Sequence, residues 1–332
     1  MTPAAISNVP FTLNRDIALT SDGSVCVINS FEFQVFCTDQ SGNRTSSLGR
    51  RGAGPGEFLH PGRLLRGPND TMGVVDFRLN KMSIFQLSGE LVSEVGLPGT
   101  MFSPSVTSFD SSVMGTAMMQ VATDGPETQA THMELIVASG EIAWKRIYRA
   151  DLVDSGCQQS PLIDGLVNGV YSPTGQLVFF VCDGQMLSFL GRDALPDTLL
   201  DAPTYTAELP NNRDLESYRE SLRTTMRAYA GVQVRVDAYG RRAKPYSRGA
   251  MFDEVGRLWV LTTKDQDLFS YLDIYENGQV HAGTIRVPDR VVGFDIIDTT
   301  LVALLDWPVG SDDVDLLQEV NWYDITDLGL EW

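Results

Sequence analysis

The stretch Gly49-Arg-Arg-Gly-Ala-Gly-Pro-Gly-Glu-Phe-Leu-His-Pro61 decides the fold of this 332-residue chain. Glycine and proline fill six of its thirteen positions. Such a segment cannot lie inside a helix or a central strand, because glycine costs backbone entropy and proline lacks an amide donor. The composition therefore predicts a rigid, tightly turned crossing between two sheets.

A hairpin follows this crossing. The segment Val74-Val-Asp-Phe-Arg-Leu-Asn-Lys-Met-Ser-Ile-Phe-Gln-Leu-Ser-Gly-Glu90 reads as two short apolar strands, each closed by turn residues. Crossing and hairpin together resemble the blade junction of NHL-like six-bladed β-propellers, a group common in bacteria that carries a GxGPGEF signature. The resemblance implies an all-β propeller and implies no particular chemistry. It is strongest over residues 49–90 and 246–288.

Blade-like units recur along the chain. Alternating apolar residues predict strands in units at about 16–48, 62–97, 103–149, 162–209, 248–287 and 291–326. The last unit is one strand short, and the segment Ile6–Leu13 has no partner of its own. We therefore expect a single domain over residues 1–332, a six-bladed propeller closed by its N-terminal strand. Units three and four resemble the family least, so five or seven blades are the alternatives.

One segment breaks this pattern. Within residues 211–231, apolar side chains recur at positions 215, 218, 222, 226 and 229, which is helical spacing. Asn212 suits the N-cap and Gly231 suits the C-terminal stop. The pattern predicts a helical insertion between blades four and five.

Charge and hydropathy exclude some classes of protein. A net charge of −18 argues against binding nucleic acid. No apolar run reaches about 18 residues, so no membrane span is expected. Residues 289–332 carry one basic and eleven acidic residues, whereas residues 213–248 carry nine basic and four acidic ones. Oppositely charged regions suit oriented docking to a partner, and ordinary solvation is the alternative.

Four cysteines are present, and no CxxC pair occurs. If Phe31-Glu32 is the turn of the first hairpin, Cys26 falls opposite Cys37, and a disulfide could form in an oxidising compartment. Two small buried apolar side chains are the alternative, and a longer loop would alter the turn. The resembled group is often exported, which implies an extracytoplasmic or periplasmic location. The chain begins with no recognisable leader, which favours the cytoplasm instead.

Four arginines precede the expected inner turns at similar distances. They lie 8, 7, 8 and 9 residues before Gly23, Asp70, Gly256 and Thr299, respectively, and are Arg15, Arg63, Arg248 and Arg290. The starts of the inner strands ring one mouth of a propeller channel, and guanidinium groups suit bidentate capture of carboxylate or phosphate. We expect an anion-binding or partner-binding site there. Ion pairing between blades is the alternative.

Catalytic signatures such as GxSxG, HExxH, Walker and EF-hand loops do not occur. We expect no catalytic residues, metal site or cofactor. The exception is calcium, for which an acidic loop could supply some of the oxygen ligands, but an exposed hairpin loop is the preferred interpretation of that loop. Its residues are Asp306, Asp312, Asp313, Asp315 and Glu319.

Three functions follow. The first is a non-catalytic scaffold, an accessory subunit that docks a protein partner in a larger, membrane-associated assembly. The second is a lactonase-type, lyase-type or glycan-cleaving enzyme acting on an acidic sugar at the channel mouth. The third is a sensor or carrier of an anionic ligand.

Overall fold

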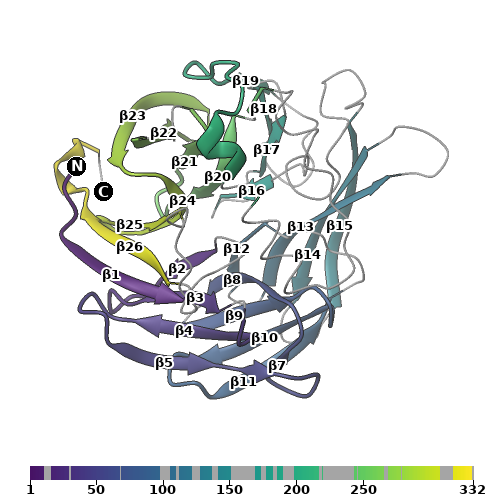
Figure 1. Cartoon of the computed structure of the whole chain (residues 1–332). Helices are drawn as coiled ribbons and strands as arrows, with labels where there is room; N and C mark the ends of the chain where they lie inside the picture. The colour runs from purple at the N-terminus through teal and green to yellow at the C-terminus, as the bar shows by residue number, and fades with distance from the viewer. Residues whose placement is uncertain are drawn as a thin grey trace.

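A computed structural model gives the fold (Figure 1). It describes residues 1–10, 16–29, 31–67, 69–97, 105–109, 112–121, 128–136, 141–150, 169–172, 177–181, 185–189, 198–216, 219, 243–244, 246–264, 268–277, 279–306 and 317–330. Within these ranges most residues lie in strands, and the strands form six four-stranded antiparallel sheets and one two-stranded parallel sheet.

The first three sheets follow the chain in order. Blade one contains β2 (Ile17–Leu19), β3 (Val25–Asn29), β4 (Gln34–Thr38) and β5 (Arg44–Leu48). Blade two contains β8 (Pro61–Gly67), β9 (Thr71–Asp76), β10 (Lys81–Gln86) and β11 (Leu91–Gly96). Blade three contains β12 (Ser105–Phe109), β13 (Ser112–Val121), β14 (Thr128–Ile136) and β15 (Glu141–Ala150).

The other three sheets complete the set. Blade four contains β16 (Gly169–Tyr171), β17 (Leu177–Val181), β18 (Gln185–Phe189) and β19 (Thr198–Asp201). Blade five contains β20 (Ser247–Phe252), β21 (Leu258–Thr262), β22 (Phe269–Glu276) and β23 (Val280–Pro288). Blade six contains β24 (Val291–Ile297), β25 (Thr300–Leu305) and β26 (Leu317–Asp324), and its outer strand is β1 (Ala5–Pro10).

The blades form a ring. Each first strand contacts the first strands of the two neighbouring blades, in the cyclic order β2, β8, β12, β16, β20 and β24 and back to β2. The sheets therefore radiate from a common axis, with their first strands innermost, and the molecule is a six-bladed β-propeller.

The two ends of the chain meet in blade six. Strand β1 pairs antiparallel with β26, from Ala5 opposite Trp322 to Pro10 opposite Leu317. In Figure 1 the purple N-terminal strand lies directly beside the yellow C-terminal one. The segment predicted to supply the missing strand begins one residue later in the sequence than the observed strand, and residues 11–13 lie outside the described part.

The core lies between the blades rather than in one central mass. One buried cluster joins blade one to blade two, including Ile28, Val35, Leu64 and Val74. Similar clusters join blades four and five, five and six, and six and one. Both faces of a middle strand are therefore covered, and β3 and β21 are buried at every residue. A continuous apolar run such as Val25–Ile28 is the sequence signature of such a strand.

The glycine-rich crossing connects β5 to β8, as predicted. Its short strands β6 (Arg50–Arg51) and β7 (Glu57–Phe58) pair in parallel. Gly49 has φ +71°, and a Cβ atom there would collide with the ring of Phe58. Phe58 itself is fully buried and packs edge-on against Phe85 of blade two, with ring centroids 5.9 Å apart. The motif thus brings an aromatic anchor into the interface between two blades.

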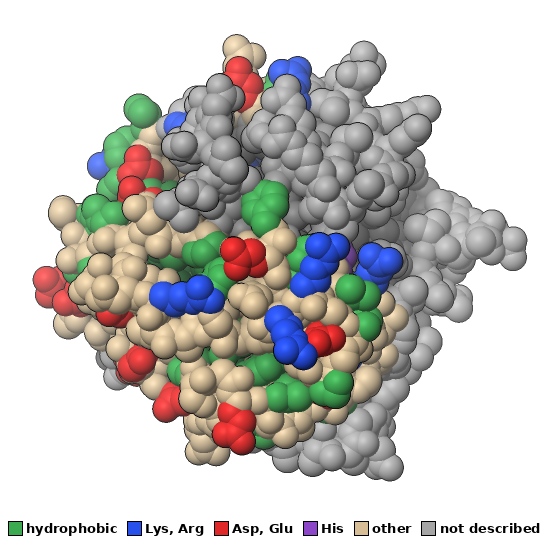
Figure 2. Space-filling view, turned by 60° about the horizontal axis from the view of Figure 1, so that its bottom comes forward, with side chains coloured by type: hydrophobic (Ala, Val, Ile, Leu, Met, Phe, Trp, Pro, Cys, Tyr) green, Lys and Arg blue, Asp and Glu red, His purple; other side chains and the backbone are tan. Residues whose placement is uncertain are grey.

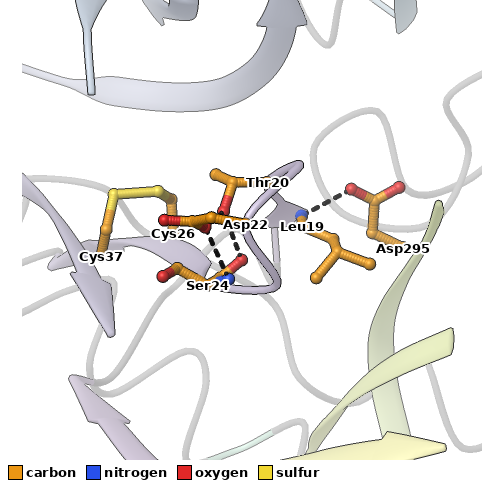
Figure 3. Close-up of a disulfide and its surroundings, with 7 residues drawn as sticks. All are labelled: Leu19, Thr20, Asp22, Ser24, Cys26, Cys37 and Asp295. Atoms are coloured by element: carbon orange, nitrogen blue, oxygen red, sulfur yellow. Dashed lines mark hydrogen bonds between the residues drawn. A yellow bond between two sulfur atoms is a disulfide. The ribbon is translucent and has the colours of Figure 1, made fainter. Parts of the chain in front are cut away.

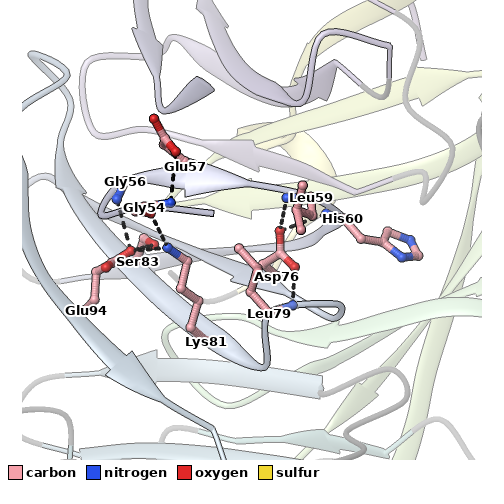
Figure 4. A network of polar contacts seen from close by, with 10 residues as sticks. All are labelled: Gly54, Gly56, Glu57, Leu59, His60, Asp76, Leu79, Lys81, Ser83 and Glu94. Carbon is pink, nitrogen blue, oxygen red and sulfur yellow. Dashed lines mark hydrogen bonds and ion pairs between the residues drawn. The ribbon is translucent and has the colours of Figure 1, made fainter. Parts of the chain in front are cut away.

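Carboxylates fasten the backbone of this crossing (Figure 4). Glu57 Oε2 accepts from the amide of Gly54 at 2.8 Å, and Glu94 Oε1 accepts from the amide of Gly56 at 3.0 Å. The Lys81 ammonium donates to the carbonyl of Gly54 at 2.8 Å and pairs with Glu94 at 2.5 Å. The loop is therefore held to blade two by hydrogen bonds as well as by packing.

The first hairpin has the predicted register but a longer loop. Cys26 lies opposite Cys37, while the last paired residues are Asn29 and Gln34. The proposed two-residue turn at Phe31-Glu32 is therefore wrong, because the side chain of Asn29 accepts from the amides of both residues and widens the loop. A disulfide joins the two cysteines, which are 0% and 2% exposed (Figure 3).

The disulfide gives a stability prediction. Replacing both Cys26 and Cys37 by Ala should lower the free energy of unfolding by about 2–3 kcal/mol, because the bond closes a short loop in the unfolded chain. Urea denaturation without reductant measures this. Fully reduced wild type is the control and should behave like the double variant. Equal stability of oxidised and reduced wild type would contradict the prediction.

Candidate functional site

The predicted arginines do not occupy equivalent places on the inner strands. The same backbone hydrogen bond recurs at the start of three blades. The carbonyl oxygens of His60, Tyr246 and Arg290 each accept from the backbone amide that directly follows the second strand of the same blade. Arg290 thus matches His60 and Tyr246, whereas Arg63 lies three residues beyond this point and Arg248 two. Arg15 lies outside the described residues. The described arginines therefore hold three different positions relative to their sheets.

Arg63 pairs with an aspartate of the preceding blade. Its Nη1 lies 3.2 Å from Asp16 Oδ1, and the side chain is 32% exposed. The other carboxylate oxygen of Asp16 accepts from the backbone amide of Leu64. A single carboxylate just before β2 therefore holds both the backbone and a side chain of β8. Arg63 was interpreted either as part of an anion-binding or partner-binding site or as a member of an ion pair between blades. Its contact with Asp16 is an ion pair between blades.

A second ion pair links the two blades on either side of blade one. Arg66 Nη2 of blade two lies 3.4 Å from Asp295 Oδ1 of blade six. Blade one stands between these two blades, and its inner strand β2 is only three residues long. The pair therefore passes over the inner end of blade one, which places the Arg66 guanidinium in the axial space. Asp295 Oδ2 also accepts from the amide of Leu19 in β2 at 2.7 Å (Figure 3).

We call Asp16, Arg63, Arg66 and Asp295 the axial charge cluster. Burial raises the pKa of the Asp16 carboxyl, although Arg63 and the Leu64 amide act against it. Burial likewise raises the pKa of Asp295, against Arg66 and the amides of Leu19 and Ile296. Asp295 further raises the pKa of Asp16 by charge repulsion. Raised carboxyl pKa values beside arginines are common at binding and catalytic sites.

Arg290 belongs to a separate, interior network. It is 1% exposed, and its guanidinium pairs with Asp214 at 2.8 Å and with Asp306 at 2.8 Å. The Lys244 ammonium lies 3.4 Å from Asp214 and 3.2 Å from Glu208. This network joins the starts of blades five and six to the helical insertion. Arg290 is neutralised within the protein.

The insertion begins one residue earlier than predicted. Residues 212–216 are helical, and the rest of the expected helix to residue 231 lies outside the described part apart from residue 219. Asn211, not Asn212, caps the helix, because its side chain accepts from the Asp214 amide at 2.9 Å while Asp214 accepts from the Asn211 amide at 3.0 Å. This reciprocal pair is a capping box, and Asp214 is the same residue that pairs with Arg290.

A third polar group lies between blades four and five. Asp273 is fully buried, and its carboxylate accepts from Tyr246 Oη at 2.6 Å, from Thr284 Oγ1 at 2.6 Å and from Thr204 Oγ1. Tyr246 Oη also lies 2.6 Å from Tyr275 Oη, and burial raises the pKa of both phenols. This group was not predicted from the sequence. The available signal was an acidic residue, Asp273, inside the apolar run Leu272–Ile274.

The expected calcium loop lies mostly outside the described part, which lacks residues 307–316. Asp306 at its start pairs with Arg290. In the described ranges, no group of three or more His, Cys, Asp or Glu side chains is arranged to hold a metal ion. In the same part of the chain, no helix is both long and apolar enough to cross a membrane.

Comparisons with known proteins agree on the fold. The family DUF5128, described as a 6-bladed beta-propeller, matches residues 15–111, which is less than a third of the chain. No curated protein matches the sequence. The structure of U3-55K is 10% identical, with a TM-score of 0.54, and the alignment covers 96% of this chain and 99% of that one.

Two Bacteroides structures are similar to the same extent. A Bacteroides fragilis protein that carries the designation exported protein is 12% identical, with a TM-score of 0.51 and coverage of 98% of this chain and 93% of that one. A DUF4221 member from Bacteroides vulgatus is 8% identical, with a TM-score of 0.51 and coverage of 97% of both chains. At such identities these likenesses establish the propeller architecture.

Removing Arg290 from the interior network should greatly lower the stability of the protein. In an Arg290→Gln variant, Asp214 and Asp306 lose the guanidinium that pairs with both of them, although Lys244 still lies 3.4 Å from Asp214, so the free energy of unfolding should fall by about 3 kcal/mol near neutral pH. Urea denaturation measures the change. Arg78→Gln, at an exposed turn of blade two, is the control and should change stability little.

The same variant has a defined pH dependence. Burial acts to raise the pKa of Asp214, but the Asn211 amide, Arg290 and Lys244 outweigh it and hold that pKa below its usual value. The stabilisation is therefore present above the unfolded-chain pKa of about 3.9 and is lost as the pH falls through the lower folded pKa. The stability difference between wild type and Arg290→Gln should shrink in acid, and a constant difference would contradict this assignment.

Proposed function

We propose that this protein is a non-catalytic interaction propeller, an accessory subunit that docks an acidic segment of a protein partner at the axial ends of blades one, two, five and six. The observation that carries the proposal is that the buried carboxylates of the protein already accept hydrogen bonds from other groups of the protein. Each buried aspartate in the described residues accepts hydrogen bonds from groups of the protein; these are Asp76, Asp214, Asp253, Asp273 and Asp295. The carboxylates thus stiffen the framework.

Asp76 illustrates this use of a carboxylate. Its Oδ2 accepts from the amides of Leu59 and His60 at 2.7 Å each, and its Oδ1 accepts from the amide of Leu79 at 2.7 Å (Figure 4). The same Oδ1 also accepts from the amide of Arg78 at 2.9 Å. A carboxylate with four amide donors is occupied by the backbone. Such a group orders a turn and a blade junction and has little capacity left for a reacting substrate.

The arginines of the axial charge cluster are the groups suited to a partner. Arg63 and Arg66 are 32% and 28% exposed, so part of each guanidinium reaches solvent while a carboxylate holds the other side. A guanidinium fixed in this way loses little entropy when it binds a carboxylate. Arg248, half-buried at the bulge of β20, is the further arginine that we assign to this contact.

The surface charge also supports oriented docking. Figure 2 shows the face of the molecule that is turned forward from the bottom of Figure 1, where most Asp and Glu side chains lie along the lower and left margin and several Lys and Arg side chains lie nearer the centre. On a chain of net charge −18, such a local basic region steers an acidic partner. The Cys26–Cys37 disulfide and the likeness to a protein designated as exported support a location outside the cytoplasm.

An acidic peptide tests the contact. A fluorescent hexaglutamate peptide should bind the wild type at low salt and near pH 7, as measured by anisotropy. The Arg63→Gln, Arg248→Gln double variant should bind it about tenfold more weakly, a loss of about 1.4 kcal/mol. Arg286→Gln, an exposed arginine on the outer strand of blade five, is the matched control. Equal affinity of the double variant and wild type would overturn the assignment.

One observation favours an enzyme instead. The two carboxyls of the axial charge cluster have raised pKa values, which suits a general acid, and the neighbouring arginines could hold an acidic sugar. Lactone hydrolysis followed by proton release, and uronate cleavage followed by the absorbance of an unsaturated product, distinguish the two. Turnover that disappears in Asp16→Asn would establish the enzyme, and we expect no turnover. A sensor or carrier would bind small anions without a protein partner.

A further inference from the structure

We propose that the axial charge cluster is a proton-coupled anion site, in which binding a carboxylate, sulfate or phosphate group is accompanied by uptake of one proton by Asp16 or Asp295. The inference rests on the proposed function, because it concerns the same arginines. It adds a condition, protonation of one aspartate, under which these arginines bind an anion more tightly.

The axial charge cluster is balanced in charge. It contains two aspartates and two arginines, each arginine within 3.4 Å of one carboxylate oxygen. With all four groups ionised, their charges cancel, and an anion that approaches gains little net attraction. Once one aspartate is protonated, the cluster carries one net positive charge. The attraction for an anion then rises steeply, because the groups lie at the low-dielectric inner ends of the blades.

The two oxygens of each carboxylate in the cluster bind different groups. In Asp16, Oδ2 accepts from the Leu64 amide while Oδ1 faces Arg63. In Asp295, Oδ2 accepts from the Leu19 amide while Oδ1 faces Arg66 and also accepts from the Ile296 amide. A proton placed on Oδ1 breaks the ion pair and leaves the amide bond to Oδ2 intact. The blades therefore stay joined while the arginine is released.

Both arginines of the cluster are partly accessible to solvent. Arg66 reaches across the inner end of β2 to blade six, so its guanidinium lies in the axial space. In the described part of the chain, Asp16 and Asp295 are the acceptors of these two guanidiniums, so their remaining N–H groups can bind a ligand. Each guanidinium is a planar donor of the kind that matches the oxygens of a tetrahedral or carboxylate anion.

The raised pKa values support this coupling. The charged groups that face Asp16 are Arg63 and Asp295, and the one that faces Asp295 is Arg66, with Asp16 nearby. Burial outweighs both arginines and raises the pKa of each carboxyl. A bound anion would raise these pKa values further, since it disfavours the neighbouring carboxylate. Reciprocal coupling of proton and anion follows by linkage.

Sulfate is the test ligand, because its charge stays constant across the relevant pH range. Isothermal titration of the full chain should show sulfate affinity at least about tenfold higher near pH 5 than near pH 7.5. Repeating the titration near pH 5 in two buffers of different ionisation enthalpy should give an uptake approaching one proton per sulfate. Affinity independent of pH, or binding with no proton uptake, would overturn the proposal.

Variants assign the effect to the cluster. Asp295→Asn removes a charge but keeps an oxygen for the Leu19 amide, so it should bind sulfate near pH 7.5 about as tightly as wild type does near pH 5. Asp16→Asn serves the same purpose if Asp295→Asn does not fold. Arg66→Gln should abolish the binding seen near pH 5. The control is Asp298→Asn, because Asp298 is exposed in the turn after β24 and is not part of the cluster. This variant should keep the wild-type pH dependence. Wild-type pH dependence in Asp295→Asn and Asp16→Asn would contradict the assignment.

The two proposals fail in different ways. Binding of hexaglutamate near pH 7 without proton-linked sulfate binding would leave the docking function and refute the coupling. Proton-linked sulfate binding without hexaglutamate binding would support the coupling and favour a small anion over a protein segment as the ligand. If neither ligand binds, both proposals are wrong.

Discussion

At two of the six blade junctions, a backbone amide of one blade donates a hydrogen bond to a carboxylate of the preceding blade, and these bonds tie the inner strands together. Asp16 accepts from Leu64 between blades one and two, and Asp295 accepts from Leu19 between blades six and one. The inner strands are where the sheets come closest, and an apolar side chain would leave those amides without an acceptor. The cost of burying a carboxylate there is offset by two or more donors per group. These buried carboxylates also place negative charge near the axis, and Arg63 and Arg66 form ion pairs with them.

Most of the architecture could be predicted from the sequence. Strands such as Val25–Asn29 and Leu258–Thr262 are continuous apolar runs bounded by turns, so their class and approximate limits follow from local chemistry. The pairing of the first strand with the last also followed, because one unit lacked a strand and one strand lacked a unit. Errors arose where a side chain altered a local turn. Asn29 lengthened the first hairpin loop, and Asn211 took the cap position in place of its neighbour.

The site could be predicted only in part, for two physical reasons. First, the inner strands β8, β20 and β24 each contain a bulge near their start, at which the register shifts. An extra residue changes the face that later side chains share, so similar spacing from a turn does not mean equivalent positions. Second, the partners of Arg66 and Arg290 are distant in the sequence or lie in the insertion. The one available signal was an acidic residue inside an apolar run, as in Phe294-Asp295-Ile296.

The pairing of β1 with β26 has a consequence for how the chain is made. Strand β1 is synthesised long before β26, so Ala5 stays without its partner until Trp322 has been made. Until then blade six lacks its outer strand, and the ring is not closed. So distant a contact is slow to form, because the whole intervening chain must be ordered. The ring should therefore remain an open, aggregation-prone arc until β26 has been synthesised, and a chaperone that shields the free edges would act at that stage.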